Sequence, residues 1–183
     1  MDHDLPASRL VGTVDERDHV QGPASAVVTL VEYGDYQCQR TRSAHPVVTR
    51  LRHLSGDWLR FVFRHFPRTD AHEFAEIAAE AAEAAGAQNM FWEMHNYLMS
   101  RRELDEGSLM DYAEEIGLDL DRFEADLEKG IYKRRIKEDI ASGNASGVHR
   151  TPAFFMNGIK FDGALTEEGM LEALEYAAEN VED

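Results

Sequence analysis

The chain has 183 residues, enough for one domain with a sizeable core or for a domain that carries a large insertion. Hydrophobic residues make up 43% and charged residues 30%, a balance typical of a folded soluble protein and not of a disordered one. The formal net charge of −16 argues against nucleic acid as a partner. Apolar runs stay far below the ~20 residues that a membrane span needs, so we expect no membrane association.

The beginning of the chain and its cysteine content bear on the compartment. Residues 1–23 are polar and acidic, and we expect an extended arm or a short extra strand there. They lack the basic and then apolar pattern of a secretory signal, so we expect a cytoplasmic protein unless a leader precedes this sequence. Cys38 is the single cysteine, which excludes an internal disulfide framework.

The first half of the chain predicts a β-α-β unit. Residues 27–33 (VVTLVEY) are rich in β-branched side chains and predict a strand that ends at Gly34. Residues 38–54 repeat apolar side chains at helical spacing, with a kink expected at Pro46. Residues 58–66 (WLRFVFRHF) alternate and predict a second strand. A β-α-β crossover places its two strands parallel in one sheet.

The middle of the chain predicts helices alone, and strands return near the end. The expected helices cover residues 71–86, 87–100, 108–117 (with Ser108 as N-cap), 119–130 and 131–146. The segment TPAFFMNGIKFDG predicts a hairpin turning at Asn157-Gly158, and residues 166–181 predict a last helix. We therefore expect an arm (1–26), a sheet domain (27–69 and 148–183) and a helical insertion (70–147).

Charge is unevenly distributed, and the cysteine opens a basic segment. Between Cys38 and Arg68 there are seven arginines and one acidic residue, Asp57, whereas residues 70–147 are strongly acidic. The arginines either form a solvated helix face that balances acidic neighbours, or help to hold a thiolate or an anionic thiol substrate.

Cys38 lies directly after a predicted strand and at the start of a predicted helix. The free N–H groups and the dipole of a helix N-terminus stabilise an anion, so a thiolate is favoured there, and Arg40 and Arg42 would add to the effect. A lone cysteine is otherwise often buried and inert. The strand–cysteine–helix context favours a reactive thiol.

A second candidate site element is Thr151-Pro152, directly before the predicted hairpin. This proline either protects a strand edge or forms a cis peptide that presents the preceding backbone to a bound thiol partner. His149 and Arg150 come just before it, and either contact a substrate or are solvated loop residues.

Together these segments resemble the DsbA-like branch of the thioredoxin superfamily. The resemblance rests on VTLVEYGDYQC, LRFVFRHFP, AAEAAEAAGAQNMFWEMH and SGVHRTPAFFMNG, and it runs from about Asp18 to Val181. It implies an α/β thioredoxin fold (a β-α-β … β-β-α mixed sheet) with an inserted all-helical subdomain, and the activity of a bacterial thiol–disulfide oxidoreductase.

The resemblance also implies roles for individual residues. Cys38 matches the attacking cysteine of the family's Cys-x-x-Cys motif, and Pro152 matches the cis proline that faces it, with Thr151 as the preceding residue that tunes the thiol. Glu32 matches an acid that family members place beneath the active site and implicate in proton transfer. From the sequence alone, Glu32 could also be a carboxylate at a strand end that is exposed to water.

The chain departs from the family at the second cysteine, where it has Thr41, and between the two positions, where Gln39-Arg40 replaces the usual Pro-Tyr or Pro-His. Without a resolving thiol, a mixed disulfide cannot be released by an internal disulfide, which excludes ordinary dithiol oxidase chemistry for the isolated chain. Thr41 can still donate a hydrogen bond to the Cys38 thiolate. We expect Gln39, Arg40, Arg150 and Thr151 to contact the substrate.

The favoured function is a monothiol oxidoreductase with protein or small-molecule thiols and disulfides as partners. It would need no bound cofactor, but glutathione or another low-molecular-weight thiol as co-substrate. The alternatives are a redox-inactive binding module and a glutathione-dependent transferase or isomerase on the same fold; the oligomeric state is not indicated. The eight histidines show no His-x-x-x-His pair and no clustering with the cysteine, so we expect no metal site.

Overall fold

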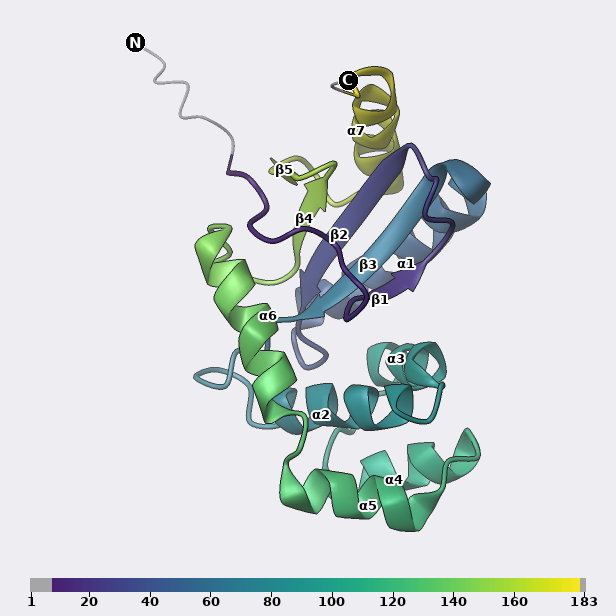
Figure 1. The fold of residues 1–183 in the computed structure, drawn as a ribbon, viewed down its shortest axis with the longest axis vertical. Coiled ribbons are helices and arrows are strands. Elements are labelled where there is room, and N and C mark those ends of the chain that lie inside the picture. Colours follow the sequence, from purple (N-terminus) through teal and green to yellow (C-terminus); the bar gives the residue numbers. More distant parts are fainter. Residues whose placement is uncertain (1–7, 182–183) are drawn as a thin grey trace.

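The predicted apolar and β-branched segments form one mixed sheet. In the computed structural model, which describes residues 8–181, its five strands lie in the order β1-β3-β2-β4-β5 (Figure 1). β2 and β3 are parallel, and the other neighbours are antiparallel. The strands are β1 (His19–Gln21), β2 (Val28–Gly34), β3 (Leu59–His65), β4 (Ala153–Met156) and β5 (Ile159–Phe161).

The register of the two parallel strands determines at which edge of the sheet functional side chains can come together. β2 and β3 pair residue for residue from Val28 opposite Leu59 to Gly34 opposite His65. Both strands therefore end at the same edge of the sheet. The segments that follow them, which begin at Asp35 and Phe66, meet there, as is usual for functional loops at the carboxyl ends of parallel strands.

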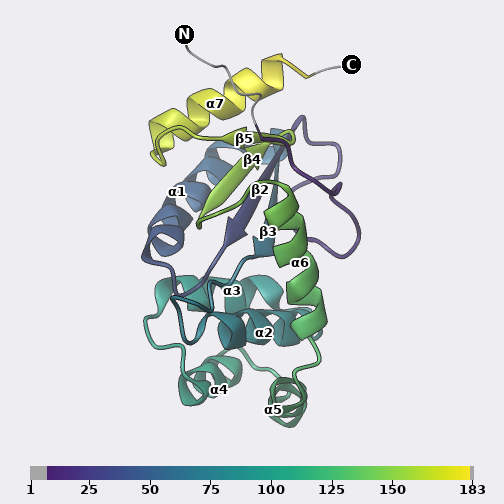
Figure 2. The same cartoon turned by 90° about the vertical axis from the view of Figure 1, so that its left-hand side faces the viewer.

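Helices cover both faces of the sheet. Figure 2 shows α1 (Gln39–Ser55) and α7 (Glu167–Glu179) on one face and α6 (Lys133–Ala145) on the other. Alternating strand residues supply the two apolar cores, with Leu30 and Phe61 on the side of α1 and Val31 and Val62 on the side of α6. α6 thus lies in the predicted helical insertion by sequence but packs against the sheet.

The remaining helices gather beyond the edge where β2 and β3 end (Figures 1 and 2). They are α2 (Ala75–Gly86), α3 (Phe91–Ser100), α4 (Glu106–Glu115) and α5 (Leu120–Lys129). α2 lies at the centre of this group, and its alanines 78, 81 and 82 are fully buried. Small side chains let the neighbouring helices approach α2 closely, which explains its composition. Among residues 8–181, no helix is both long and apolar enough to cross a membrane.

The predicted order of elements and the mixed α/β sheet are confirmed, with local corrections. α4 is capped by Asp105, whose side chain accepts the backbone N–H group of Ser108, so Ser108 is not the N-cap. α2 begins at Ala75, because residues 71–74 form turns. Of the predicted amino-terminal arm, residues 1–7 lie outside the described part, and the rest contains β1. Pro46 lies inside α1.

Candidate active site

Cys38 occupies the N-cap position of α1. Its backbone is extended (φ −71°, ψ 119°), and its side chain is half-buried. The first turn of α1 has no acidic residue and no side-chain cap. The Cys38 side chain therefore lies at the positive end of the helix dipole, with no acidic side chain in the first turn of α1.

The sulfur faces the segment before β4. The Cys38 Sγ atom donates to the carbonyl oxygen of Thr151 at 3.4 Å. The peptide bond between Thr151 and Pro152 is cis, and both residues are buried. The fold thus brings together residues that are 113 positions apart in the chain.

Asp35 fixes the loop that carries Cys38. It is 1% exposed, and its Oδ1 atom accepts the backbone N–H groups of Gln37 at 2.8 Å and of Cys38 at 3.2 Å. Its Oδ2 atom accepts the backbone N–H of Arg68 at 2.9 Å and lies 2.7 Å from Nδ1 of His72. Our sequence analysis missed Asp35. An aspartate three positions before a helix N-cap is typical of a turn stabilised by its own side chain, and this signal could have found it.

The next two residues of the loop are anchored as well. Tyr36 is 1% exposed, packs on Phe63 with ring centroids 5.3 Å apart, and its hydroxyl lies 3.0 Å from Nδ1 of His95. The side chain of Gln37 accepts the backbone N–H of Phe74 at 2.7 Å, just before α2. The position of Cys38 is therefore set by the sheet, α2 and α3 together.

Thr41 is fully buried one turn into α1. Its hydroxyl oxygen accepts the backbone N–H of Asp35 at 3.4 Å. Its methyl group packs against Gly34, where an added Cβ atom would lie 3.1 Å from Thr41 Cγ2 and 2.4 Å from a ring carbon of Phe63. Thr41 thus fills space and holds the loop, while a hydrogen bond from its hydroxyl to Cys38 stays a prediction.

Glu32 is a buried acid in β2, with 1% of its surface exposed. It lies between Phe63 of β3 and Phe154 of β4, and its Oε1 atom has no hydrogen-bond partner among residues 8–181. Burial raises the pKa of Glu32 to about 8, so the side chain is mostly protonated at neutral pH. A water-exposed carboxylate, one of the two readings of the sequence, is ruled out.

Among the arginines of the basic segment, Arg68 is electrostatically coupled to the thiol. Its side chain pairs with Asp70 at 2.9 Å and donates to the carbonyl oxygen of His149 at 2.9 Å. The hydrogen bond to Asp70 is the main cause that raises the pKa of Arg68, and the charges of Asp35 and of the Cys38 thiolate add to it. Arg68 therefore lies close enough to Cys38 for a charge on the sulfur to affect it.

The other arginines of the segment have different surroundings. Arg42, which we expected to support the thiolate, donates to the carbonyl oxygen of Met99. Arg64 is buried and pairs with Asp18 at 2.8 Å. The predicted substrate-binding residues Gln39, Arg40 and Arg150 are exposed, whereas the fourth, Thr151, is 4% exposed.

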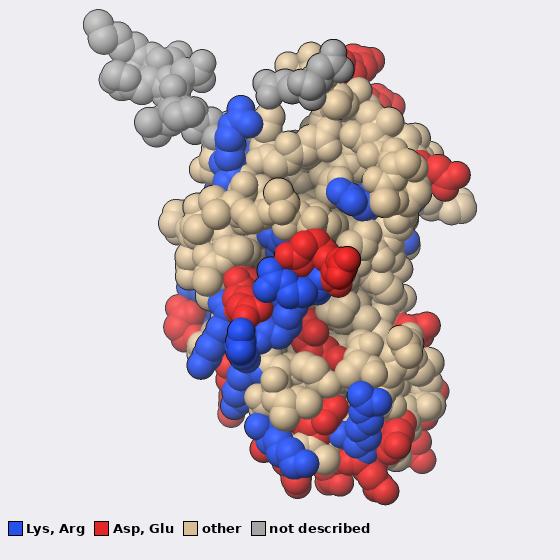
Figure 3. Space-filling model, viewed as in Figure 1, with Lys and Arg blue, Asp and Glu red and all other residues tan. Residues whose placement is uncertain are grey.

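The molecular surface shows no uniform charge on the face drawn in Figure 3. Acidic and basic side chains are interleaved over its middle, and acidic ones prevail over α4 and α5. A groove of about 770 Å³ lies between β5 and α7, lined by apolar residues such as Phe161 and Tyr176. Cys38 and Pro152 do not line this groove, so it is separate from the thiol site.

The fold and the site define a thioredoxin-type protein, with a cysteine at a helix N-terminus that faces the residue before a cis proline. Residues 14–176 match the thioredoxin family profile, and the chain belongs to that family. The structure is similar to a thioredoxin-like oxidoreductase from Silicibacter pomeroyi DSS-3 (TM-score 0.81, 27% identity, 92% of this chain and 95% of that one). It also shares its fold with oxidised BdbD from Bacillus subtilis (TM-score 0.84, 18% identity, 95% and 98% coverage).

Curated relatives give a second kind of similarity. The chain is 46% identical over 165 residues to the Na(+)/H(+) antiporter NhaA 1 of Salinispora arenicola, covering 88% of this chain and 25% of that protein. It is 41% identical over 174 residues to the antiporter NhaA of Herminiimonas arsenicoxydans, covering 93% and 28%. The chain thus spans about a quarter of the length of these relatives.

Proposed function

We propose that this protein is a thiol–disulfide oxidoreductase that acts through Cys38 alone. The observation that carries the proposal is the position of the Cys38 sulfur, at an uncapped helix N-terminus and 3.4 Å from the Thr151 carbonyl oxygen. The helix end and Arg68 favour the thiolate, which is the attacking species in disulfide exchange. The backbone of Thr151 and the ring of Pro152 form a wall beside it for the substrate.

The proposed reaction has two exchange steps. In the first, the Cys38 thiolate attacks one sulfur of a disulfide, a new S–S bond forms, and the other sulfur leaves as a thiolate that takes up a proton. In the second, an external thiolate attacks the mixed disulfide and releases Cys38. The balance is one disulfide reduced and one formed from the external thiol and the first partner, so the chain itself ends unchanged.

Other residues would support these steps. Glu32, with a pKa of about 8, can accept or release a proton near neutral pH, and we propose that it does so for the thiol and the leaving group. Thr41 would donate a hydrogen bond from its hydroxyl group to the Cys38 thiolate, because the oxygen of that group already accepts the backbone N–H of Asp35. Gln39, Arg40, Arg150 and Thr151 would line the approach of the substrate.

The external thiol of the second step is proposed to be glutathione or another low-molecular-weight thiol. A chain with one cysteine depends on a reducing thiol pool, which the cytoplasm supplies, so we place the protein there. If this thiol also reacts with electrophiles at the site, the protein would be a glutathione-dependent transferase or isomerase. Binding of glutathione without disulfide reduction would favour that variant of the function.

The test is glutathione-coupled reduction of a small disulfide, hydroxyethyl disulfide, with intact-mass detection of the mixed disulfide on Cys38. We expect turnover by the parent protein and none by Cys38→Ser. A matched control is Ser43→Ala, which changes a hydroxyl on the same helix without touching the thiol. Absence of both turnover and a mixed disulfide in the folded parent protein would refute the proposal.

A second candidate function follows from the curated relatives. Because a quarter of each Na(+)/H(+) antiporter matches this chain, the chain could act as a redox-inactive binding module that works with such a membrane protein. Under this proposal, Cys38→Ser would leave binding to the membrane protein intact. The reactivity of Cys38 therefore separates the two candidates.

A further inference from the structure

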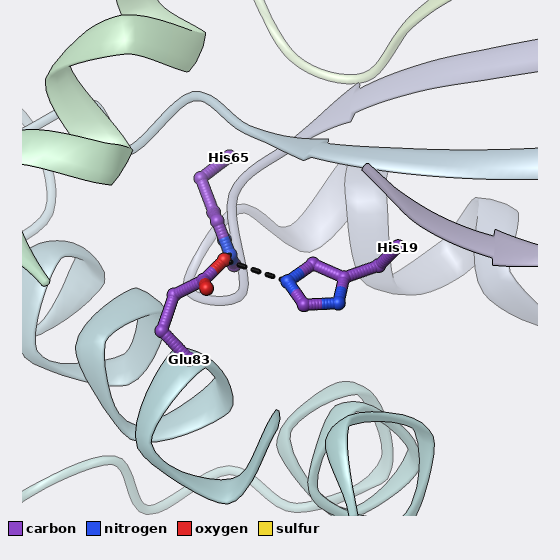
Figure 4. Close-up of side chains that lie close together, drawn as sticks. All are labelled: His19, His65 and Glu83. Carbon is purple, nitrogen blue, oxygen red and sulfur yellow. Dashed lines mark hydrogen bonds and ion pairs between the residues drawn. The ribbon is translucent and has the colours of Figure 1, made fainter. Parts of the chain in front are cut away.

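Three side chains far apart in the sequence meet behind the edge where β3 ends (Figure 4). They are His19 of β1, His65 at the end of β3 and Glu83 of α2, and one possible ligand atom of each lies within 4.8 Å of the others. The Nε2 atoms of both histidines lie 2.8 Å from the same oxygen, Glu83 Oε1. In Figure 4, both rings point toward that carboxylate.

The carboxylate of Glu83 is enclosed beside the two imidazole rings, and its side chain is 8% exposed. Among residues 8–181, the ion pairs of Glu83 are with these two histidines, and Arg135 interacts with its charge without forming an ion pair with it. A buried anion faced by two imidazoles is a ready set of donors for a cation.

We propose that His19, His65 and Glu83 form a binding site for a divalent transition metal ion such as Zn²⁺ or Co²⁺. Imidazole nitrogen and carboxylate oxygen are ligands that these ions take, and two histidines with one glutamate leave a fourth coordination position open. Tetrahedral ligands about 2.0–2.1 Å from the ion lie roughly 3.3–3.4 Å apart. Binding would therefore move each histidine nitrogen, now 2.8 Å from Glu83 Oε1, away from that oxygen by about 0.5 Å.

The surrounding residues hold the two rings in this arrangement. His19 stacks on Phe91 with centroids 3.5 Å apart and planes within 4° of parallel. His65 is 1% exposed and lies edge-on to Phe63 and Phe91. The side chain of His19 is 19% exposed, so an ion can reach the cluster from the side of β1.

The hydrogen bonds that the two histidine rings make outside the proposed metal site limit its affinity for a metal ion. A ring that coordinates through Nε2 carries its proton on Nδ1 and normally donates it to an acceptor. The Nδ1 atom of His65 is buried and has no partner among residues 8–181. We therefore expect binding on the order of 10-fold to 100-fold weaker than at a site whose outer contacts are complete.

The test uses the full chain with Cys38→Ser and His3→Gln, because a thiol and a histidine near the amino terminus bind metal on their own. We expect Co²⁺ to give visible absorption bands at one equivalent, and Zn²⁺ to displace it and to raise the Tm. In this background, His19→Gln should weaken binding at least about 10-fold and abolish the rise in Tm. His19 is chosen because it is partly exposed, so its replacement leaves the core intact.

The matched control is His53→Gln, an exposed histidine of α1, which should bind like the background. His65→Gln, checked for folding by circular dichroism, should lose binding as His19→Gln does. Saturable one-to-one binding that depends on His19 and His65 would support the site. No binding at high micromolar metal, or binding that His19→Gln leaves unchanged, would overturn it. Because Cys38 is absent, neither result depends on the proposed disulfide exchange.

Discussion

The carboxylate of Asp35 accepts the backbone N–H group of Cys38 at 3.2 Å and thereby ties the candidate nucleophile to the end of β2. The same carboxylate accepts from Arg68, which follows β3, and lies against His72. One buried acid therefore joins the two loops that leave the parallel strands. The accuracy with which the sulfur is placed depends on this residue.

Replacing Asp35 should cost more stability than replacing a neighbouring exposed acid. Asp35→Ala leaves the backbone N–H groups of Gln37 and Arg68 without their acceptor, and leaves that of Cys38 with the Asp35 carbonyl oxygen alone. We expect a loss of roughly 2–4 kcal/mol in the free energy of unfolding. Asp70→Ala, which removes the exposed pair with Arg68, should cost much less, because exposed ion pairs are screened by water. Urea denaturation of both variants measures the difference, and equal losses would contradict the role given to Asp35.

Arg68 should affect the reactivity of Cys38 more than Arg40 does. The charge of Arg68 interacts with that of the Cys38 thiolate without a direct contact, so Arg68→Gln should slow alkylation of Cys38 by iodoacetamide by at most about 5-fold at pH 6 and low salt. A higher salt concentration should reduce the difference in alkylation rate between Arg68→Gln and the parent protein. Arg40→Gln is the control, because its exposed side chain has no contact with the thiol loop among the hydrogen bonds of residues 8–181. A larger effect of Arg40→Gln on alkylation would favour the sequence-based prediction that Arg40 helps to stabilise the Cys38 thiolate.

The buried acid Glu32 predicts a pH dependence of stability. Its pKa is about 8 in the folded protein and near the usual 4.5 in the unfolded chain, so between these values the folded state holds a proton that the unfolded state has released. The contribution of Glu32 to stability therefore falls as pH rises from about 4.5 through 8. Because glutamine does not ionise, Glu32→Gln should not lose this stability as the pH rises.

The measurement compares unfolding free energies at pH 5 and pH 9. From pH 5 to pH 9, the unfolding free energy of Glu32→Gln should increase relative to that of the parent protein by on the order of 3 kcal/mol. Glu73→Gln, at an exposed position, serves as the control and should track the parent protein. If Glu32→Gln also tracks it, the carboxyl is not protonated in the folded state.

The fold was largely predictable because its signals are local. The alternation in residues 58–66 and the Asn157-Gly158 turn each specify a backbone shape, and in the structure both turn residues have positive φ (47° and 80°), as a tight hairpin requires. The start of α4 was less clear, since Gly107 weakens the helical pattern before Ser108. The cap by Asp105 overcomes that weakness.

The site was predictable only where the family motif reaches. Cys38 and Pro152 both belong to that motif, and the antiparallel pairing of β2 with β4, which places Tyr33 opposite Ala153, explains why they meet. Asp35 has a local signal, its spacing before the helix N-cap, whereas His65 and Glu83 have none, because their partners come from other strands and helices. Such clusters depend on how the elements pack, which a pattern along one chain does not encode.

Thr41→Cys tests the geometry of the proposed site directly. Thr41 is buried one turn after Cys38, where the family has its resolving cysteine, and a thiol there could close an internal disulfide with Cys38. We expect oxidation of this variant to remove both free thiols without dimer formation. Release of the mixed disulfide should no longer need glutathione, although each further turnover still needs an external thiol to reduce the internal disulfide. Thr41→Ser keeps the hydroxyl and should behave as the parent protein. If the Thr41→Cys variant instead keeps its free thiols under oxidant, the sulfur of Cys38 does not face this position, and Thr41 cannot stabilise its thiolate either.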